Sequence, residues 1–488
     1  MTGNLVYSKW KLLVCSKQEK LAHKLQTGKY YQINQKEGPK MRERTRKALA
    51  LLLAVCMVLS LVPAAYAAPE DGTWQVPFTE VEDAQALELR EPVEETTPET
   101  LYDANETVRV SIVLEEPSTL ERGYATADIA SNGGATAYRS GLQKGQETMA
   151  QTISRQALSG EELDVVWNLT LAANLISADV AYGDIEAIQA VPGVKEVILE
   201  TRYEPAVYAT GEADPNMATS GEMIGTSAAY AAGYTGAGMR IAVIDTGTDT
   251  DHKSFDADAF AYALAEDEKA SGEAYDLLDA AEIGAVLPQL NAYKRTLQNG
   301  KPTAATPTAE QLYGTAKLPF HYNYVDGDLD VTHDNDDQGE HGSHVAGIAT
   351  ANRYIKTENG FVSALEAVKV QGVAPDAQLI TMKVFGKNGG AYDSDYMAAM
   401  EDAILLGCDV VNLSLGSSNP GNTYNETYQS FLEQLKETDT VVAVAAGNAG
   451  TWADGAWNGH LYSDSVSLDM VGSPGSYTNS FTVASADN

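Results

Sequence analysis

The sequence of 488 residues contains little cysteine, few basic residues and few long apolar runs. Its three cysteines are too few for the disulfide framework that holds many small secreted domains together. Lys and Arg number 33 against 68 Asp and Glu, which gives a formal net charge of −35. Because so acidic a surface repels nucleic acid and anionic lipid, we expect neither as a partner.

The longest apolar run, residues 48–59, has the setting of a secretion signal. It follows the basic segment 41–47 and precedes Ala65-Tyr66-Ala67, a small-x-small cleavage site. A membrane anchor is the alternative, but a spanning helix needs about 20 apolar residues. We therefore predict a signal peptide over 41–67 and no membrane insertion of the mature form. Residues 1–40 are an upstream extension, either never translated or a long leader to the signal.

Cleavage after Ala67 would leave Cys408 as the one cysteine of the mature chain. This residue lies in LLGCDVV, where a helix is expected to pass into a strand. We interpret it as a small buried apolar residue rather than a reactive thiol. Residues 68–104 are rich in Glu, Pro and Thr, which is typical of a solvated linker.

Two structured regions follow this linker. Residues 105–205 predict a small α+β unit. Its expected strands are 108–114, 165–171 and 194–200, and its expected helices are 137–157 and 182–191. From Tyr234 onward apolar strands alternate with helices, which favours a parallel sheet covered by helices. The expected strands are 239–244, 377–384, 409–415, 440–446 and 481–484, and the expected helices are 395–406 and 431–436. The acidic stretch 251–318 interrupts this alternation and is expected to be a surface excursion.

Asp245 ends one of these apolar strands and is followed by Thr246-Gly247, where the backbone can turn sharply. A carboxylate at the end of a buried strand is held rigidly, as is needed to orient an imidazole and to stabilise its charged form. A turn or helix-cap aspartate is the plainer interpretation of this segment taken alone.

His341 opens the segment HGSHVAGI, which predicts a helix that begins with an imidazole facing a cleft. Gly342 and Gly347 would let this helix approach the sheet closely. Two histidines three residues apart also suggest zinc, but the zinc-peptidase pattern places them four apart with a glutamate between them. We therefore predict no metal here and interpret His344 as a packed or hydrogen-bonded helix residue.

Asn448 follows the apolar strand at 441–446. Its amide could donate to an oxygen that becomes negative in a transition state, although AAGN alone could be a mere turn. Together with Asp245 and His341, in this order, it supplies an orienting acid, a proton-carrying base and an oxyanion donor. Such a set serves a serine nucleophile.

The segments DTG, HGSHVAG and AAGN resemble, in this order, the subtilisin-like serine peptidases, or subtilases, over residues 234–488. The segments PFHYNYVDGD, GVAPDAQLITMKVFG and VGSPGSYTNSFTVASADN are similar to the lactocepin-type cell-envelope proteinases of Gram-positive bacteria. The resemblance implies an α/β fold with a subtilisin-like three-layer parallel sheet, incomplete here, and residues 215–488 as the N-terminal part of the catalytic domain. It also implies that residues 105–205 are a ferredoxin-like, inhibitor-like propeptide. Such a propeptide assists folding and occupies the cleft until it is cut, here between about residues 205 and 220.

The same resemblance assigns a role to each site residue. Asp245 orients the base, His341 is the general base and then the general acid, and Asn448 binds the oxyanion. Ser414-Leu415-Gly416 forms the strand that pairs with an extended peptide substrate. Ala445-Ala446-Gly447 forms the opposite wall of the pocket beside the cleaved bond.

The nucleophile of the family stands in a GTSMAxP segment downstream of the oxyanion asparagine, and the sequence up to Asn488 contains no such segment. The segment GTSAA around Ser227 looks similar. However, it precedes Asp245 and has Tyr230 in place of the proline. We therefore interpret Ser227 as a helix cap and expect the nucleophile beyond Asn488.

Two classes of function remain. The first is a secreted or cell-envelope-associated serine endopeptidase of Gram-positive type that hydrolyses peptide bonds in proteins. Its partners would be protein or peptide substrates and its own propeptide, and the present chain alone would be inactive. The alternative is a catalytically inactive fragment or pseudo-peptidase that acts as a binding or inhibitory module. A downstream GTSMAxP segment would favour the first class.

An acidic run upstream of His341 resembles a calcium-binding loop. Its members are Asp326, Asp328, Asp330, Asp334, Asp336 and Asp337. The EF-hand pattern fails because Val331 replaces the required glycine, so we favour a solvated acidic loop. We expect no cofactor; the resemblance allows calcium elsewhere, at no identified position.

Overall fold

The computed structural model describes most of the chain after residue 101. The described residues are 102–126, 129–203, 217–272, 274–295, 297–298, 301–302, 306–334, 336, 338–387, 389–416, 426–447 and 471–484. The predicted signal peptide at 41–67, almost all of the predicted linker and Asn448 lie outside these residues. Within the described ranges, no helix combines the length and the apolar character needed to cross a bilayer.

Residues 102–203 fold into an antiparallel sheet of four strands with helices packed against it. Its elements are β1 (Thr107–Leu114), α3 (Gly133–Gln156), β2 (Asp164–Leu169), β3 (Leu175–Ala181), η1 (Tyr182–Asp184), α4 (Ile185–Gln189) and β4 (Val194–Leu199). The strand order is β2-β3-β1-β4, and all three pairs are antiparallel. This βαββαβ arrangement is ferredoxin-like, as the sequence analysis predicts. The strand β3 was missed, although it lies in the middle of the sheet.

A second, larger sheet has six strands that all run parallel. Its strands are β6 (Arg240–Asp245), β9 (Phe320–Asn323), β12 (Gln378–Lys383), β14 (Val410–Leu413), β15 (Val441–Ala445) and β16 (Phe481–Val483). Their order is β16-β15-β14-β6-β12-β9. The predicted parallel sheet is confirmed, and β9 is the strand that the prediction lacked.

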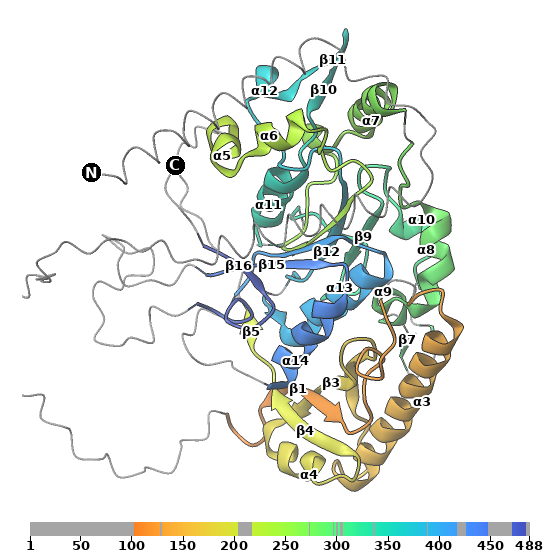
Figure 1. Cartoon of the computed structure of the whole chain (residues 1–488). Helices are drawn as coiled ribbons and strands as arrows, with labels where there is room; N and C mark the ends of the chain where they lie inside the picture. Colours follow the sequence, from red (N-terminus) through yellow and green to blue (C-terminus); the bar gives the residue numbers. More distant parts are fainter. Residues whose placement is uncertain are drawn as a thin grey trace, which may run out of the picture. The chain divides into compact units, whose positions relative to one another are not determined.

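Helices cover both faces of this sheet. These are α11 (His341–Thr350) on one side and α13 (Asp393–Leu405) with α14 (Glu426–Gln434) on the other, as Figure 1 shows. The three layers form because the central strands are apolar on both faces and must be covered twice. The remaining elements are β5 (Arg202–Tyr203), α5 (Met217–Ile224), α6 (Thr226–Ala231), η2 (Lys253–Phe255), α7 (Ala257–Ser271), α8 (Ala280–Val286), η3 (Leu287–Gln289), α9 (Asn291–Lys294), β7 (Leu297–Gln298), β8 (Lys301–Pro302), α10 (Ala309–Leu312), β10 (Tyr354–Thr357), β11 (Gly360–Ser363), α12 (Ala364–Ala367), β13 (Ala391–Tyr392) and η4 (Leu435–Glu437).

The stretch 251–318 is not the surface excursion that its polar composition predicts. Phe260, Ile283, Leu290 and Leu312 are each 0% exposed, and the last three belong to the main hydrophobic core. The helices of this stretch therefore pack an apolar face inward while their acidic residues face outward. Average composition hides such a division between two faces of a helix.

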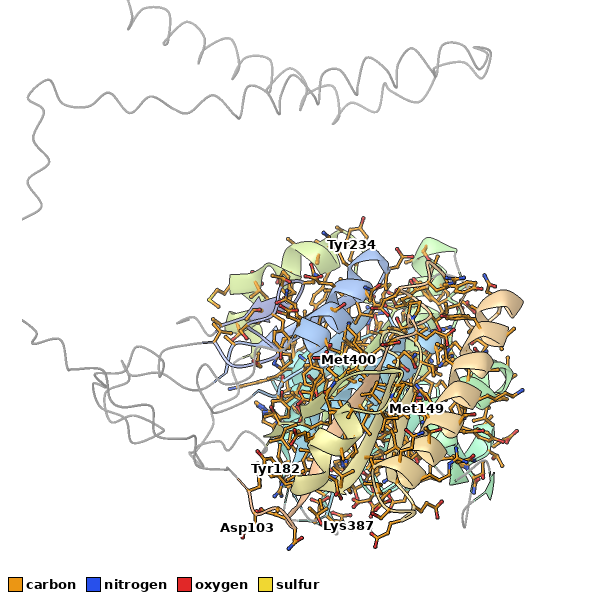
Figure 2. All side chains as sticks on the ribbon, turned by 90° about the horizontal axis from the view of Figure 1, so that it is seen from below. Asp103, Met149, Tyr182, Tyr234, Lys387 and Met400 are labelled. Carbon is orange, nitrogen blue, oxygen red and sulfur yellow. The ribbon has the colours of Figure 1, made fainter. Side chains whose placement is uncertain are left out.

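Helix α13 is buried along its whole length because it contacts β6 of the large sheet and β2 of the small one. Figure 2 shows Met400, near the middle of this helix, surrounded by other side chains, whereas Asp103 and Lys387 lie at the periphery. Polar contacts also join α13 to residues 102–203. Glu401 Oε1 accepts the backbone N–H groups of Leu171 and Ala172, each at 2.8 Å. The two sheets thus share one helix as their common support.

Candidate active site

Asp245 lies at the carboxyl end of β6, between two neighbouring strands, and is 1% exposed. Its Oδ1 accepts the backbone N–H of Thr246 at 2.7 Å. The chain then turns at Gly247, whose φ of 109° favours glycine. A Cβ at Gly247 would lie 2.1 Å from the carbonyl oxygen of Val331. The strand and this tight turn together fix where the carboxylate stands.

His341 is the first residue of α11, and its ring Nδ1 lies 2.6 Å from Asp245 Oδ1. Two glycines make this approach possible. A Cβ at Gly342 would lie 2.0 Å from the carbonyl oxygen of Gly247. The N–H of Gly342 also donates to Thr246 Oγ1 at 2.9 Å. The role predicted for Gly342 is confirmed.

The role predicted for Gly347 is wrong, because a Cβ there would meet nothing within 4 Å. A side chain at this position of α11 would therefore meet open space. His344 is exposed on the same helix. In the described part of the chain, no group of three or more His, Cys, Asp or Glu side chains is arranged to hold a metal ion.

The contact between Asp245 and His341 selects one form of the imidazole. An ionised carboxylate accepts a hydrogen bond, so Nδ1 must carry the proton, and Nε2 is then the atom that can take one up. A buried carboxylate beside the ring also stabilises the imidazolium that such a transfer creates. The pair is therefore able to act as a general base.

A buried ion pair that the sequence analysis missed lies next to this contact. Lys383 ends β12 in register with Asp245, and its Nζ lies 2.8 Å from Asp336 Oδ2. Both side chains are nearly inaccessible, at 1% and 2% exposure. Lys383 Nζ also donates to the carbonyl oxygen of Thr246. The ammonium group of Lys383 thus joins the turn that follows Asp245 to the loop that precedes His341.

The same ion pair corrects the prediction of a solvated acidic loop at one position. The side chain of Asp336 is buried, and its Oδ1 accepts the N–H of Gln338 at 2.9 Å, whereas Asp334 is exposed. Asp328 does face a solvated cation, Lys387, at 3.5 Å. The available signal was a lysine that ends a mostly apolar strand beside the predicted acid, since such a lysine needs a buried partner.

The two predicted substrate-binding segments lie at the same edge of the sheet as Asp245. Leu413 of β14 pairs with Ile244 of β6 and with Val444 of β15. Ser414-Leu415-Gly416 follows on the strand next to Asp245, and Ala445-Ala446-Gly447 follows one strand further along the same edge. Carboxyl ends of parallel strands are where sites of such sheets are found.

Sequence analysis missed a further strand near this edge. The strand β13 follows β12 along the chain and pairs antiparallel with β5, Ala391 opposite Tyr203. A Cβ at Gly390 would lie 1.9 Å from the carbonyl oxygen of Tyr203. The pair Gly389-Gly390 before a short strand was the signal, because close backbone approach requires glycine.

Ser227 lies in α6, and the interpretation of it as a helix cap is wrong. The N-cap of α6 is Gly225, which has a φ of 85° and makes no side-chain cap bond. Ser227 Oγ instead donates to the Glu222 carboxylate. Cys408 is buried as predicted, at 3% exposure, and burial raises the pKa of its thiol far above the ordinary value.

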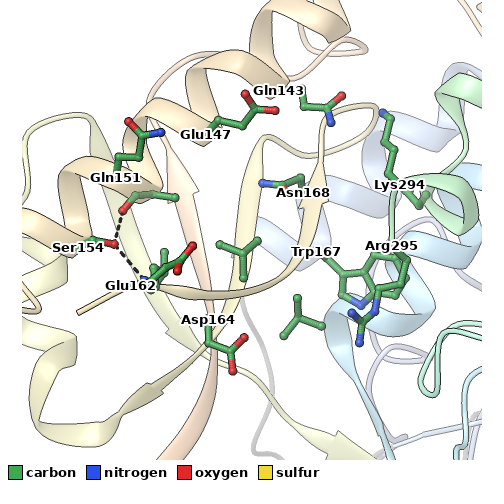
Figure 3. Close-up of a pocket in the computed structure, with 15 residues that line it drawn as sticks. Gln143, Glu147, Gln151, Ser154, Glu162, Asp164, Trp167, Asn168, Lys294 and Arg295 are labelled. Atoms are coloured by element: carbon green, nitrogen blue, oxygen red, sulfur yellow. Dashed lines mark hydrogen bonds between the residues drawn. The ribbon is translucent and has the colours of Figure 1, made fainter. Parts of the chain in front are cut away.

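A cavity of about 490 Å³ lies among α3, β2 and α9, and Figure 3 shows residues that line it. Lys294 and Arg295 line one wall, and Glu147 and Asp164 line others. Burial lowers the pKa of Lys294 to about 7. None of the predicted site residues lines this cavity.

Comparison with known proteins agrees with this geometry. A family model described as "Subtilase family" matches residues 236–488. The chain is 30% identical over 321 residues to the PII-type proteinase of Lacticaseibacillus paracasei, covering 64% of this chain and 14% of that protein. It is 29% identical over 321 residues to the PI-type proteinase of Lactococcus lactis subsp. cremoris, with coverages of 64% and 14%. The chain thus spans only a small part of the length of these relatives.

Two further similarities are more distant. The minor extracellular protease Vpr of Bacillus subtilis (strain 168) is 26% identical over 289 residues, which is 58% of this chain and 26% of that protein. A solved structure of the epidermin leader peptide processing serine protease from Staphylococcus aureus aligns with a TM-score of 0.36 and 17% identity. It covers 71% of this chain and 61% of that one.

Proposed function

Because the chain belongs to the subtilase family, we propose that it is the precursor of a secreted serine endopeptidase that hydrolyses peptide bonds in proteins. The observation that carries this proposal is the contact of 2.6 Å between His341 Nδ1 and the buried carboxylate of Asp245. Such a pair can take the proton of a serine hydroxyl and return it to the leaving amine.

In this proposal Asp245 orients the imidazole, and His341 acts first as base and then as acid. Asn448 donates to the oxyanion, where a preorganised donor is worth several kcal/mol of transition-state stabilisation. The segments 414–416 and 445–447 hold the substrate backbone on either side. The nucleophile is assigned to none of the serines that the structure describes.

We further propose that residues 105–205 are an inhibitor-like propeptide. Three features support this. The unit packs on α13, its last strand is followed by β5, and β5 pairs with β13 in the manner of a bound peptide. A segment held there blocks the edge that a substrate would need. Cleavage between about residues 205 and 220 would release it.

Export by the signal peptide at 41–67 fits this proposal, since the relatives include a protein named as an extracellular protease. We therefore propose a secreted or cell-envelope-associated location in a Gram-positive organism. The expected partners are protein or peptide substrates and the propeptide itself. The acidic composition makes nucleic acid an unsuitable partner.

The test compares two histidine variants of the protein as its gene encodes it, produced in a secreting Gram-positive host. His341→Gln should lower the rate of casein hydrolysis by at least about a thousandfold, because the base is lost. His344→Gln, on the same helix and exposed, should retain most of the activity. The two variants should unfold at similar temperatures.

Other outcomes would replace the proposal. Loss of activity in both variants together with inhibition by a chelator would favour a zinc site. Binding of the N-terminal unit without hydrolysis by any preparation would favour the binding or inhibitory module.

A further inference from the structure

The segment that leaves residues 102–203 places one aromatic side chain in an enclosed site. Tyr203 of β5 is 1% exposed, and its backbone pairs with Ala391 of β13. Its ring meets the ring of Tyr396 edge-on, with centroids 5.8 Å apart and an interplanar angle of 73°. Edge-to-face contacts of this kind favour a flat aromatic ring over a branched side chain.

A carboxylate stands at the end of this site. Tyr203 OH donates to Asp393 Oδ1 at 2.8 Å, and Tyr396 OH donates to the same oxygen at 2.9 Å. The other oxygen, Oδ2, accepts the backbone N–H of Thr201 at 2.7 Å. Asp393 is 1% exposed. The buried acceptor of this site, Asp393 Oδ1, thus lies where it meets the hydroxyl group of a tyrosine side chain.

The backbone pairing around this site does not depend on the sequence of the bound peptide. Ala391 and Tyr392 pair with β5 through backbone groups, and Gly390 leaves room for the opposing carbonyl. Any extended peptide can make these bonds, so selectivity must come from the side-chain site. This part of the molecule is linked to the candidate active site by β12, which ends in register with Asp245 and is followed along the chain by β13.

We propose that Asp393, with Tyr396, makes the peptidase selective for tyrosine at the substrate residue that pairs with Ala391. This inference rests on the proposed function, in which a substrate replaces β5 after the N-terminal unit has left. The Tyr203 ring then marks the space that a substrate side chain fills. Asp393 is a specificity-determining residue and takes no part in the hydrolysis itself.

Phenylalanine fills the same space but leaves the carboxylate without its second hydroxyl donor. A site built to hydrogen-bond a hydroxyl rejects the analogue that lacks it, because the buried polar group is then left short of a partner. Hydrogen bonds to charged groups correspond to about a tenfold to a hundredfold difference. Leucine would lose the edge-on contact with Tyr396 as well and should be poorer still.

The test measures kcat/KM of the active secreted enzyme on paired peptides. Each pair is identical except for Tyr or Phe at one position before the cleaved bond, and successive pairs move that position along the peptide. One position should prefer Tyr by about tenfold or more. Asp393→Asn, which replaces the carboxylate by a neutral amide acceptor, should lower this ratio. Ser394→Ala is the matched control, since Ser394 Oγ contacts Glu200 rather than Tyr203, and should leave the ratio unchanged.

The wild-type comparison needs no variant, so it stays decisive even where Asp393→Asn fails to fold. Equal rates for Tyr and Phe at every position would overturn the inference and leave the proposed function standing. Preference for Lys or Arg at the position affected by Asp393→Asn would overturn it equally. Absence of cleavage of any peptide would overturn the proposed function and this inference with it.

Discussion

The carboxylates at the active-site edge and on α13 are buried alike but have different partners. Asp245 uses Oδ1 for both Thr246 and His341, and its buried Oδ2 has no hydrogen-bond partner among the described residues. Asp402 of α13 instead accepts the N–H groups of Asn291 and Ala292 at 2.6 and 2.8 Å, and Tyr324 OH at 2.9 Å.

The difference in hydrogen-bond partners indicates different roles for the two buried carboxylates. Asp402 is surrounded by three donors from its own fold, so it ties its neighbours together and serves a structural role. Asp245 keeps acceptor capacity on one oxygen, and it gains most when the adjacent imidazole becomes charged. The number of donors therefore separates Asp245 from Asp402 better than burial does.

The largest expected effect comes from removing the charge at the active-site edge. Asp245→Asn keeps the shape but no longer favours a proton on His341 Nδ1, so kcat should fall by about 10⁴-fold. Steady-state hydrolysis of casein peptides measures it. Asp402→Asn is the contrasting variant and should mainly lower the unfolding temperature; an equal loss of specific activity in both folded variants would contradict the comparison.

The buried carboxylates of α13 predict an unusual pH dependence of stability. Burial raises the pKa of Asp393 to about 7 and that of Asp402 to about 7. Between about pH 4 and pH 7 the folded chain therefore holds protons that the unfolded chain has lost. The free energy of unfolding should fall as pH rises through this window, by up to about 1.4 kcal/mol per pH unit for each group.

Urea unfolding at several pH values measures this slope. Asp393→Asn should remove the share of one carboxylate and flatten the curve. A slope that is the same with and without Asp393 would show that this group is ionised in the fold throughout the window.

Lys383→Met should cost about 3 to 5 kcal/mol of unfolding free energy, because it leaves Asp336 buried without its cation. The double variant Lys383→Met/Asp336→Leu should recover much of this loss. Unfolding in urea gives both values. In the single variant the NMR signal of the His341 Nδ1 proton should also shift, since the two loops are no longer joined; an unchanged signal would limit Lys383 to a structural role.

The smallest expected effect is that of one hydroxyl. Tyr203→Phe should lower the unfolding free energy of the whole chain by about 1.5 kcal/mol, because Tyr203 OH donates to a buried carboxylate. Tyr428→Phe is the matched control. Its hydroxyl donates to Ser111 Oγ at 3.2 Å, a longer bond to a neutral acceptor, so the loss should be smaller. A larger loss of unfolding free energy in Tyr428→Phe than in Tyr203→Phe would contradict the role given to Asp393.

Much of the large sheet could be predicted from the sequence, since β6 and β15 are apolar runs that end at turn residues and β12 is mostly apolar. The strand β9 escaped because FHYN is short, although its aromatic residues alternate with polar ones. The strand β3 was overlooked although Ile176, Ala178 and Val180 alternate with Ser177 and Asp179, a pattern typical of a strand. Ser177 is buried and donates to Glu200, a contact between residues 23 positions apart that no local pattern reveals.

The candidate site divides in the same way. Asp245 and His341 lie in local motifs with strong spacing, and the structure brings them into contact. Lys383 and Asp336 are 47 positions apart, and their pairing depends on how two loops meet. The wrong assignments of Gly347 and Ser227 share one cause, because a residue type was given a role that only its neighbours in space could decide.

The two glycines at the active-site edge set a limit on variation. Gly247 and Gly342 face each other where any side-chain carbon on Gly342 would lie 2.0 Å from the carbonyl oxygen of Gly247. Asp245 and His341 can therefore lie at hydrogen-bond distance only because neither Gly247 nor Gly342 has a side chain. In a library of all single substitutions, these two glycines should tolerate no replacement, even though neither takes part in moving a proton.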